Sequence, residues 1–211
     1  MELLWVRHGE NVANDTRTLS HSVFDGDLTE RGRLQAAATA ERLAALGQPV
    51  GPVFCSPLKR ARQTAAIIAA RLRQQVSDVL PGFRELDVGE LDGRSDDDAW
   101  LVYERVLASW AAGDPQVRFP GGEDALELTD RLRSGLLQVV VASPEGSLPV
   151  VVAHGANLRA ALPWLTGEDA PGSDLPTGGW ARLSVDHGRA GQNRVALASW
   201  EGPRGVVSGA T

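Results

Sequence analysis

Short apolar runs alternate along the chain with longer segments whose apolar residues recur at helical spacing. The runs are four to seven residues long, as strands are, and the first of them are continuously apolar, which is typical of strands buried on both faces. The last two predict a terminal hairpin. The predicted strands cover residues 3–6, 52–56, 148–153, 180–185 and 194–200, with a further short strand near Val79.

Five segments show the spacing of amphipathic helices. Thr29 is placed to cap the first, and Pro57 opens the second, in which Ala61, Ala65 and Ile68 share one face. Polar or glycine-rich loops are expected at residues 10–27 and 77–95. The helices are expected at residues 29–46, after Pro57, at residues 97–112, after Pro120-Gly121-Gly122, and at residues 158–165.

Strands that alternate with helices predict an α/β fold, a three-layer sandwich whose central, mostly parallel sheet is flanked by helices. The sequence contains no internal repeat and no linker-like segment. We therefore expect a single domain over residues 1–200. Residues 201–211 are small and polar, and we expect them to form a flexible C-terminal tail.

Composition narrows the class of protein. The 211 residues carry a formal net charge of −6, which argues against nucleic acid as a partner. Cys55 is the single cysteine, so no intrachain disulfide can form, and no cluster has zinc-ligand spacing. The short apolar run between Glu2 and Arg7 does not fit a signal peptide, and the longest uncharged stretch, residues 43–58, is too short to span a bilayer. We expect a soluble cytoplasmic protein without a membrane partner.

Two histidines occupy equivalent positions in the pattern. His8 and His154 each follow an apolar strand and precede a glycine. Each could merely end its strand and bond a carbonyl, but ligands of open α/β sheets bind beyond the carboxyl ends of the strands. Two matching contexts therefore favour a shared site. Arg7 and Arg60 fall in the same layer, and Arg60 lies in the first turn of a helix, where anions bind.

A carboxylate for proton transfer cannot be chosen from the pattern alone, because residues 85–98 contain seven acidic side chains. A series of ordered motifs adds the missing information. These are Arg7-His8-Gly9-Glu10 with Asn14, Leu28-Thr29 with Gly32 and Gln35-Ala36, Ser56-Pro57-Leu58-Lys59-Arg60-Ala61, Arg84-Glu85-Leu86-Asp87-Val88-Gly89, Pro120-Gly121-Gly122-Glu123, and Ala153-His154-Gly155. In this order they resemble the histidine phosphatase superfamily, with its phosphoglycerate-mutase-like fold, over nearly the whole chain.

The resemblance implies roles for individual residues. His8 would attack phosphorus and form a phosphohistidine, and Glu85 would act as the general acid and base. Arg7, Arg60 and His154 would hold the phosphoryl oxygens. The family's chemistry implies neither a metal nor a cofactor.

Three further positions are less clearly assigned. Asn14 would add a phosphate contact. Asn11 stands where the family often has Thr or Ser, so an amide would replace a hydroxyl contact to phosphate. His21, in the loop at residues 15–27, could line the substrate side, although a surface histidine is the simpler interpretation.

The type of reaction follows less directly than the family. Only about 27 residues separate the acidic loop from Pro120, whereas mutases of the family usually carry a longer insertion there. We therefore favour a phosphomonoesterase acting on a small phosphorylated metabolite. A phosphoglycerate mutase-type enzyme and a catalytically silent phosphate-binding module are the alternatives.

Two expectations concern the surroundings of the site. The acids of residues 86–98 would repel polyphosphorylated substrates if they faced the crevice. Four tryptophans, Trp100, Trp110, Trp164 and Trp180, would pack in the core or, alternatively, form the contact of a homodimer.

Overall fold

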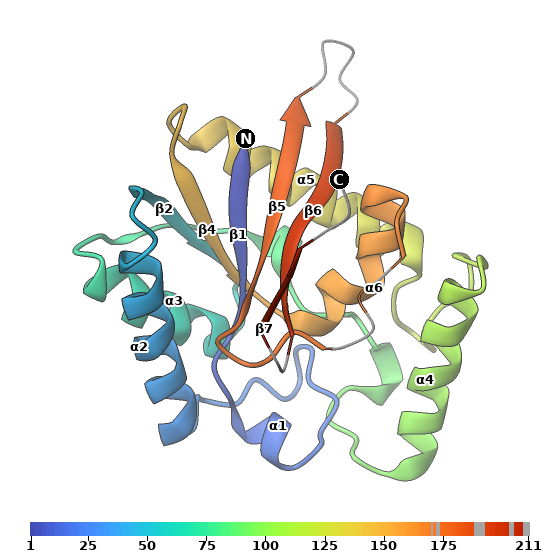
Figure 1. The fold of residues 1–211 in the computed structure, drawn as a ribbon. Helices are drawn as coiled ribbons and strands as arrows, with labels where there is room; N and C mark the ends of the chain where they lie inside the picture. Colours follow the sequence, from blue (N-terminus) through green and yellow to red (C-terminus); the bar gives the residue numbers. More distant parts are fainter. Residues whose placement is uncertain (170, 172–173, 188–192, 203–204, 209–211) are drawn as a thin grey trace.

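The structure is a computed structural model that describes residues 1–169, 171, 174–187, 193–202 and 205–208. Within these residues seven strands form one sheet (Figure 1). The strands are β1 (Glu2–Arg7), β2 (Val50–Cys55), β3 (Val76–Val79), β4 (Leu148–Ala153), β5 (Trp180–His187), β6 (Asn193–Gly202) and β7 (Gly205–Ser208). Their spatial order is β3-β2-β4-β1-β5-β6-β7.

Helices cover both faces of this sheet, which confirms the three-layer α/β sandwich. The helices are α1 (Val12–Asp15), α2 (Glu30–Ala44), α3 (Lys59–Arg71), α4 (Asp97–Ala111), α5 (Ala125–Ala142) and α6 (Gly155–Thr166), with 3-10 turns at Pro81–Phe83 and Gly89–Leu91. Helices α2 and α3 pack together on one side, and α5 and α6 on the other, with α4 beside α6 (Figure 1).

The parallel part of the sheet is β3-β2-β4-β1, and β5, β6 and β7 extend it with antiparallel pairings. The predicted hairpin is thus β5 and β6. Gly205–Ser208, within the segment predicted as a tail, pairs with β6 as an edge strand. Its two central residues are valines, which favour extended backbone. Residues 203–204 and 209–211 of that tail lie outside the described residues.

The alternation of side chains along β1 supplies the core on both faces of the sheet. Leu3 and Trp5 belong to the cluster beneath α5 and α6, whereas Leu4 and Val6 belong to the cluster beneath α2 and α3. All four are fully buried. A strand buried on both faces needs an uninterrupted apolar run, which is why the sequence pattern located β1 and β4 well.

Helix boundaries follow the local chemistry. Thr29 caps α2, and its side chain accepts a hydrogen bond from the Gly32 backbone N–H at 3.0 Å. Helix α6 begins at Gly155, three residues before the predicted start, with His154 as its N-cap. Helix α1 lies inside the segment predicted as a loop, where Asn11 and Asn14 form a reciprocal capping box.

Two glycines fix the loop that follows β1. Gly9 and Gly32 lie so close that a Cβ on Gly32 would overlap the carbonyl oxygen of Glu10, and a Cβ on Gly9 would overlap the carbonyl oxygen of Gly32. Only glycine permits this approach of two backbones. Helix α2 thereby holds the residues next to His8 in place.

We expect Gly32→Ala to lower the free energy of unfolding by about 1–3 kcal/mol, because overlap with backbone atoms outweighs the gain in helix propensity. Urea unfolding followed by circular dichroism measures the change. Gly26→Ala is the control, since its Cβ would meet side-chain atoms alone, the nearest being the Phe24 ring edge at 3.3 Å and Val12 Cβ at 3.6 Å. An equal effect of the two substitutions would contradict the assignment.

Candidate active site

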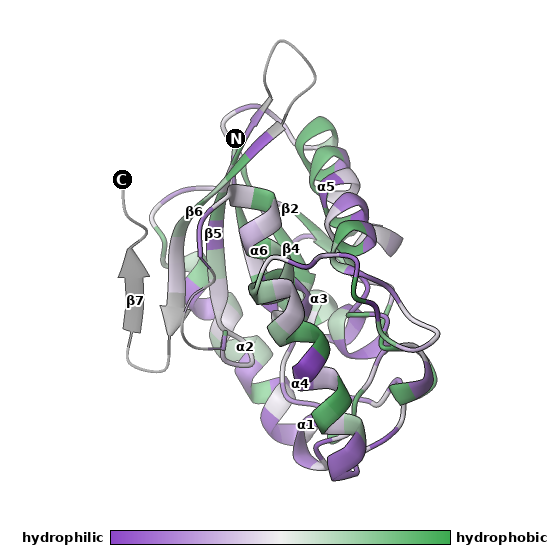
Figure 2. Cartoon of the chain, turned by 90° about the vertical axis from the view of Figure 1, so that its right-hand side faces the viewer, coloured by the Kyte–Doolittle hydropathy of each residue, from purple (hydrophilic) through white to green (hydrophobic). Residues whose placement is uncertain are grey.

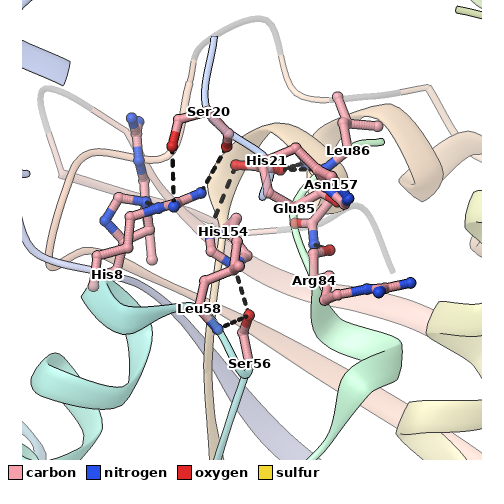
Figure 3. Close-up of polar contacts among 12 residues, drawn as sticks. His8, Ser20, His21, Ser56, Leu58, Arg84, Glu85, Leu86, His154 and Asn157 are labelled. Atoms are coloured by element: carbon pink, nitrogen blue, oxygen red, sulfur yellow. Dashed lines mark hydrogen bonds and ion pairs between the residues drawn. The ribbon is translucent and has the colours of Figure 1, made fainter. Parts of the chain in front are cut away.

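The carboxyl ends of three neighbouring parallel strands bring the candidate residues together. Strand β1 leads into His8, β2 into Ser56 and β4 into His154 (Figure 3). The rings of His8 and His154 lie edge to face, with their centroids 5.1 Å apart. The prediction that both imidazoles project into one site is therefore matched by the geometry.

His8 is held as a neutral ring whose Nε2 lone pair faces Arg60. Its Nδ1 donates to the carbonyl of Gly9 at 2.7 Å, and its Nε2 accepts from Arg60 Nε at 3.1 Å. The ring is 3% exposed. Burial, followed by the charges of Arg60 and Arg7, holds the pKa of His8 well below its usual range. Nε2 is thus the ring nitrogen that carries the lone pair, and it faces the guanidinium.

His154 is fully buried, and one of its nitrogens points into the site. Nε2 lies 2.8 Å from Ser56 Oγ, which also accepts from the Leu58 backbone N–H at 3.3 Å. The Ser56 hydroxyl can donate to Nε2 or accept from it, and the Glu85 carboxylate 3.7 Å from Nδ1 favours the His154 proton on Nδ1. Nδ1 has no hydrogen-bond partner. Burial and the nearby Arg60 charge also lower the pKa of His154.

Two arginines supply the positive charge of the site. Arg60 is 2% exposed, and its two Nη atoms donate to the hydroxyl and the carbonyl of Ser20 at 3.2 and 2.9 Å. Arg7 donates to the carbonyl of Leu175 at 2.6 Å and packs on Gly155, where a Cβ would stand 2.9 Å from Arg7 Cδ. Both guanidinium groups line the same cavity as His8.

Glu85 presents one carboxylate oxygen to the site and keeps the other bound. Oε1 accepts from the backbone N–H groups of Leu86 and Asn157, both at 3.0 Å (Figure 3). Asn157 lies in the first turn of α6, so this carboxylate also caps the helix. Oε2 lies 3.7 Å from His154 Nδ1. Oε2 is therefore the oxygen free to exchange a proton with a ligand.

The loop that carries Glu85 is held in place by two residues, Arg131 and Glu123, for which the sequence analysis predicted no role. Arg131 donates to the carbonyls of Gly82, Arg84 and Glu85 and pairs with Glu123 through two hydrogen bonds of 2.8 and 2.6 Å. Glu123 also accepts from the Asp87 backbone N–H at 2.9 Å. The Pro-Gly-Gly-Glu motif was the available signal, since it contains Glu123.

The three less clearly assigned residues lie differently from one another. Asn11 and Asn14 line the cavity, and Asn11 Nδ2 is buried without a hydrogen-bond partner. His21 is 5% exposed, so its interpretation as a surface histidine is wrong. Its Nδ1 donates to the Glu85 carbonyl at 3.0 Å, and it is not among the described cavity-lining residues. His21 therefore supports the acidic loop from behind.

The acidic segment does not form the substrate filter that its charge suggested. Asp92 accepts the backbone N–H groups of residues 21–23, and Asp96 caps α4. Among the described residues, Glu85 and Asp174 are the carboxylates that line the cavity. The prediction that the acids of residues 86–98 face the crevice is wrong, because these groups satisfy backbone donors or face solvent.

A cavity of about 390 Å³ extends from His8 toward α4 and α6. Trp100, Trp110 and Trp164 line it, whereas Trp180 belongs to the core cluster beneath α2. The prediction that the tryptophans pack in the core therefore holds for Trp180. Trp110 is also buried, and one side of it lines the cavity. Figure 2 looks onto α6 and α4, which lie on the same side of the sheet.

The site is better suited to an anion than to a metal ion. Ligand atoms of His8, Glu85 and His154 lie within 4.8 Å of one another, so three ligands are at hand. His8 Nε2, however, already accepts a hydrogen bond from the Arg60 cation. A metal ion would have to displace that bond and lie beside a buried positive charge, whereas a phosphoryl group would gain from it.

Comparison with known proteins gives the same picture. The chain is 34% identical over 169 residues to the probable phosphoglycerate mutase GpmB of Cronobacter sakazakii, covering 79% of this chain and 75% of that protein. The structure of the mycobacterial glucosyl-3-phosphoglycerate phosphatase matches with a TM-score of 0.77 at 25% identity, covering 95% and 98% of the two chains. A putative α-ribazole-5'-P phosphatase from Escherichia coli shares the fold, with a TM-score of 0.68 at 24% identity over 93% and 94% of the chains.

The fold and the site define a phosphoryl-transfer enzyme. The chain belongs to the histidine phosphatase superfamily (branch 1), whose profile matches residues 3–200. Among the described residues, no helix has the length and apolar character needed to cross a membrane.

We expect the rings of His8 and His154 to stay neutral at pH 6.5, where an exposed histidine is half protonated, because burial and Arg60 lower both pKa values. Ring-nitrogen NMR titration measures this. Below about pH 6.5 the two histidines bind protons in the unfolded chain but stay neutral in the folded chain. The free energy of unfolding should therefore fall between pH 7.5 and 5.5, by at most about 1.4 kcal/mol per pH unit for each ring.

The double variant His8→Asn/His154→Asn separates these two rings from other titrating groups. Its free energy of unfolding should change less over the same pH range than that of the unsubstituted protein. An unchanged pH dependence would show that other groups are responsible.

Proposed function

We propose that the protein is a metal-independent phosphomonoesterase that hydrolyses a small phosphorylated metabolite through a phosphohistidine on His8. The observation that carries this proposal is the state of His8, a buried neutral imidazole whose Nε2 lone pair faces Arg60 at 3.1 Å. Such a ring combines an available nucleophile with cations for the phosphoryl oxygens. Arg7 completes the anion site, and His154 Nδ1–H supplies a further donor.

The reaction runs in two steps that share one proton carrier. The Arg60 Nε–H turns from His8 Nε2 to a phosphoryl oxygen, and Nε2 then attacks phosphorus. The bond to the ester oxygen breaks, and the Glu85 carboxyl gives its proton to that oxygen. Water then attacks the phosphohistidine, the N–P bond breaks, and Glu85 takes the proton from the water. Inorganic phosphate leaves, and His8 returns to its neutral form with the proton on Nδ1.

Glu85 is suited to this role because one of its carboxylate oxygens is hydrogen-bonded to the backbone and the other is not. Oε1 is occupied by two backbone donors, which hold the carboxyl in place. Oε2 lies beside His154 Nδ1 and lines the cavity, where an ester oxygen or a water can reach it. One carboxyl can therefore serve both half-reactions without moving.

A hydrolase fits the surroundings better than a mutase. A mutase must return the phosphoryl group to a bound acid, which calls for cations beyond the phosphoryl site. In the described part of the cavity wall beyond that site, the cation is Arg159, and it pairs with Asp174 at 2.5 Å. One relative is named as a probable phosphoglycerate mutase, so the mutase is the alternative to test. A catalytically silent phosphate-binding protein would be expected to lack one of the residues His8, Arg7, Arg60, Glu85 and His154, and all five are present.

We expect His8→Asn to abolish both turnover and phosphoenzyme formation. Brief mixing of a ³²P-labelled phosphomonoester with the unsubstituted protein in EDTA should give an acid-labile, base-stable label that decays to inorganic phosphate. Label in a folded His8→Asn protein would refute the assignment of the nucleophile. Transfer of the label to 3-phosphoglycerate instead of water would favour the mutase, and loss of activity in EDTA would overturn metal independence.

We expect the effect of Glu85→Gln to depend on the leaving group. An alkyl phosphate needs a proton on its departing oxygen, so kcat/KM should fall about 10²–10⁴-fold. A 2,4-dinitrophenyl phosphate leaves without one and should lose far less in the phosphorylation step, measured as the burst of dinitrophenolate. Glu90→Gln, exposed in the same loop, is the control. Equal losses for both esters would remove Glu85 from the acid role.

A further inference from the structure

The half of the cavity remote from His8 is built as an apolar chamber between α4 and α6. We propose that this chamber binds an apolar or aromatic leaving group, so that the preferred substrate is a phosphomonoester of an alkyl or aryl alcohol. The inference rests on the proposed phosphatase function and narrows its substrate class. The proposed substrate thus differs from the polar phosphoglycerates that appear in the names of two similar proteins.

Helix α4 supplies one wall. Trp100, Tyr103, Leu107 and Ala111 recur at the spacing of a single helical stripe, and all four line the cavity together with Trp110. The ring of Tyr103 stacks on Phe119 and meets Trp100 edge to face, with centroid distances of 5.6 and 5.2 Å. Aromatic packing of this kind fixes the ring planes and keeps the wall in shape.

The polar atoms of two indoles on this wall are already paired with backbone. Trp100 Nε1 donates to the carbonyl of Arg17 at 2.9 Å, and Trp110 Nε1 donates to the carbonyl of Val117 at 2.6 Å. A bound ligand therefore meets the carbon surface of these rings. Burial raises the pKa of Tyr103, so its hydroxyl stays a neutral phenol.

Helix α6 and the acidic loop supply the facing walls. Ala156 and Ala160, one turn apart, leave room where larger side chains would close the space, and Pro163 and Trp164 continue the apolar surface. Leu86 and Val88 close the side nearest Glu85. The leaving-group oxygen would thus lie at the Glu85 carboxyl, with its carbon substituent among apolar side chains.

The two charged side chains of the chamber, Arg159 and Asp174, pair with each other. Arg159 and Asp174 are both exposed and form an ion pair at its rim. The Tyr103 hydroxyl is a polar group in the chamber, but most hydroxyl or carboxylate groups of a sugar or a carboxylic acid would lack a partner there, which is costly. A hydrocarbon group needs no polar partner and gains from the removal of its surface from water. The whole cavity, with the phosphoryl site included, has a volume of about 390 Å³, which fits a ligand of modest size.

A series of unbranched alkyl phosphates tests the proposal, because ethyl, butyl and hexyl phosphate share nearly the same leaving-group basicity. Each methylene that enters the chamber should raise kcat/KM by about 2.5- to fourfold, so hexyl phosphate, with four more methylenes, should exceed ethyl phosphate by at least about thirtyfold. Phenyl and 2-naphthyl phosphate form the aromatic arm. Glycerol 3-phosphate, 3-phosphoglycerate and glucose 6-phosphate should rank below hexyl phosphate, and a polar ester at the top would overturn the proposal.

Two variants on α4 locate the effect. Leu107→Gln puts an amide into the chamber and should lower kcat/KM for hexyl phosphate at least tenfold while ethyl phosphate changes less than threefold. Leu101→Gln makes the same replacement on the same helix at a side chain that is 58% exposed and does not line the cavity, and it should change neither value. Ala160→Gln on α6 repeats the test if Leu107→Gln is unstable. Equal losses for both esters would contradict the assignment.

Binding without turnover separates this inference from the proposed function. Calorimetry should show hexylphosphonate binding at least thirtyfold more tightly than ethylphosphonate, and Leu107→Gln should remove most of that difference. Tight hexylphosphonate binding with no hydrolysis of any ester would overturn the phosphatase and keep the apolar chamber. Hydrolysis with no preference for longer chains in either assay would keep the phosphatase and overturn the chamber.

Discussion

The contact between Arg60 Nε and His8 Nε2 is the interaction on which the site depends. A guanidinium can only donate, so the imidazole must offer a lone pair there, and the Gly9 carbonyl fixes its proton on the other nitrogen. Both side chains are almost fully buried, which makes the charged imidazolium costly. The neutral imidazole and the guanidinium are therefore held in contact by the fold itself.

The rest of the fold keeps this pair from relaxing. Strand β1 is buried on both faces, and the Gly9–Gly32 approach locks the turn after it, so His8 cannot swing away. Arg60 lies in the first turn of α3, and its remaining donors contact Ser20 and pair with Asp25 at 3.5 Å. A phosphoryl group would add acceptors beside the guanidinium groups of Arg60 and Arg7, which favours an anion there.

Sequence reasoning found those parts of the site that are local. His8, Arg60 and His154 follow apolar strands or open helices, so pattern alone brought them to one edge, and the family resemblance singled out Glu85. The Arg131–Glu123 clamp, the burial of His21 and the cavity wall were missed. They join segments that are far apart in sequence, and no spacing encodes which side chain meets which carbonyl. The orientation of the acidic side chains was mispredicted because their hydrogen bonds to backbone N–H groups, such as those of Asp92 and Asp96, could not be read from the sequence.

Glu85 connects the two halves of the cavity, and the loop that carries it explains why they cannot vary independently. The same short segment presents its carboxyl to the phosphoryl site and its neighbours Leu86 and Val88 to the apolar chamber. Arg131 holds three carbonyls around Glu85, so a shift of the loop would move acid and wall together. Substitutions on α4 and α6 should therefore be the ones that change the leaving-group preference. They alter the far wall of the cavity and leave the position of Glu85 relative to His8 unchanged.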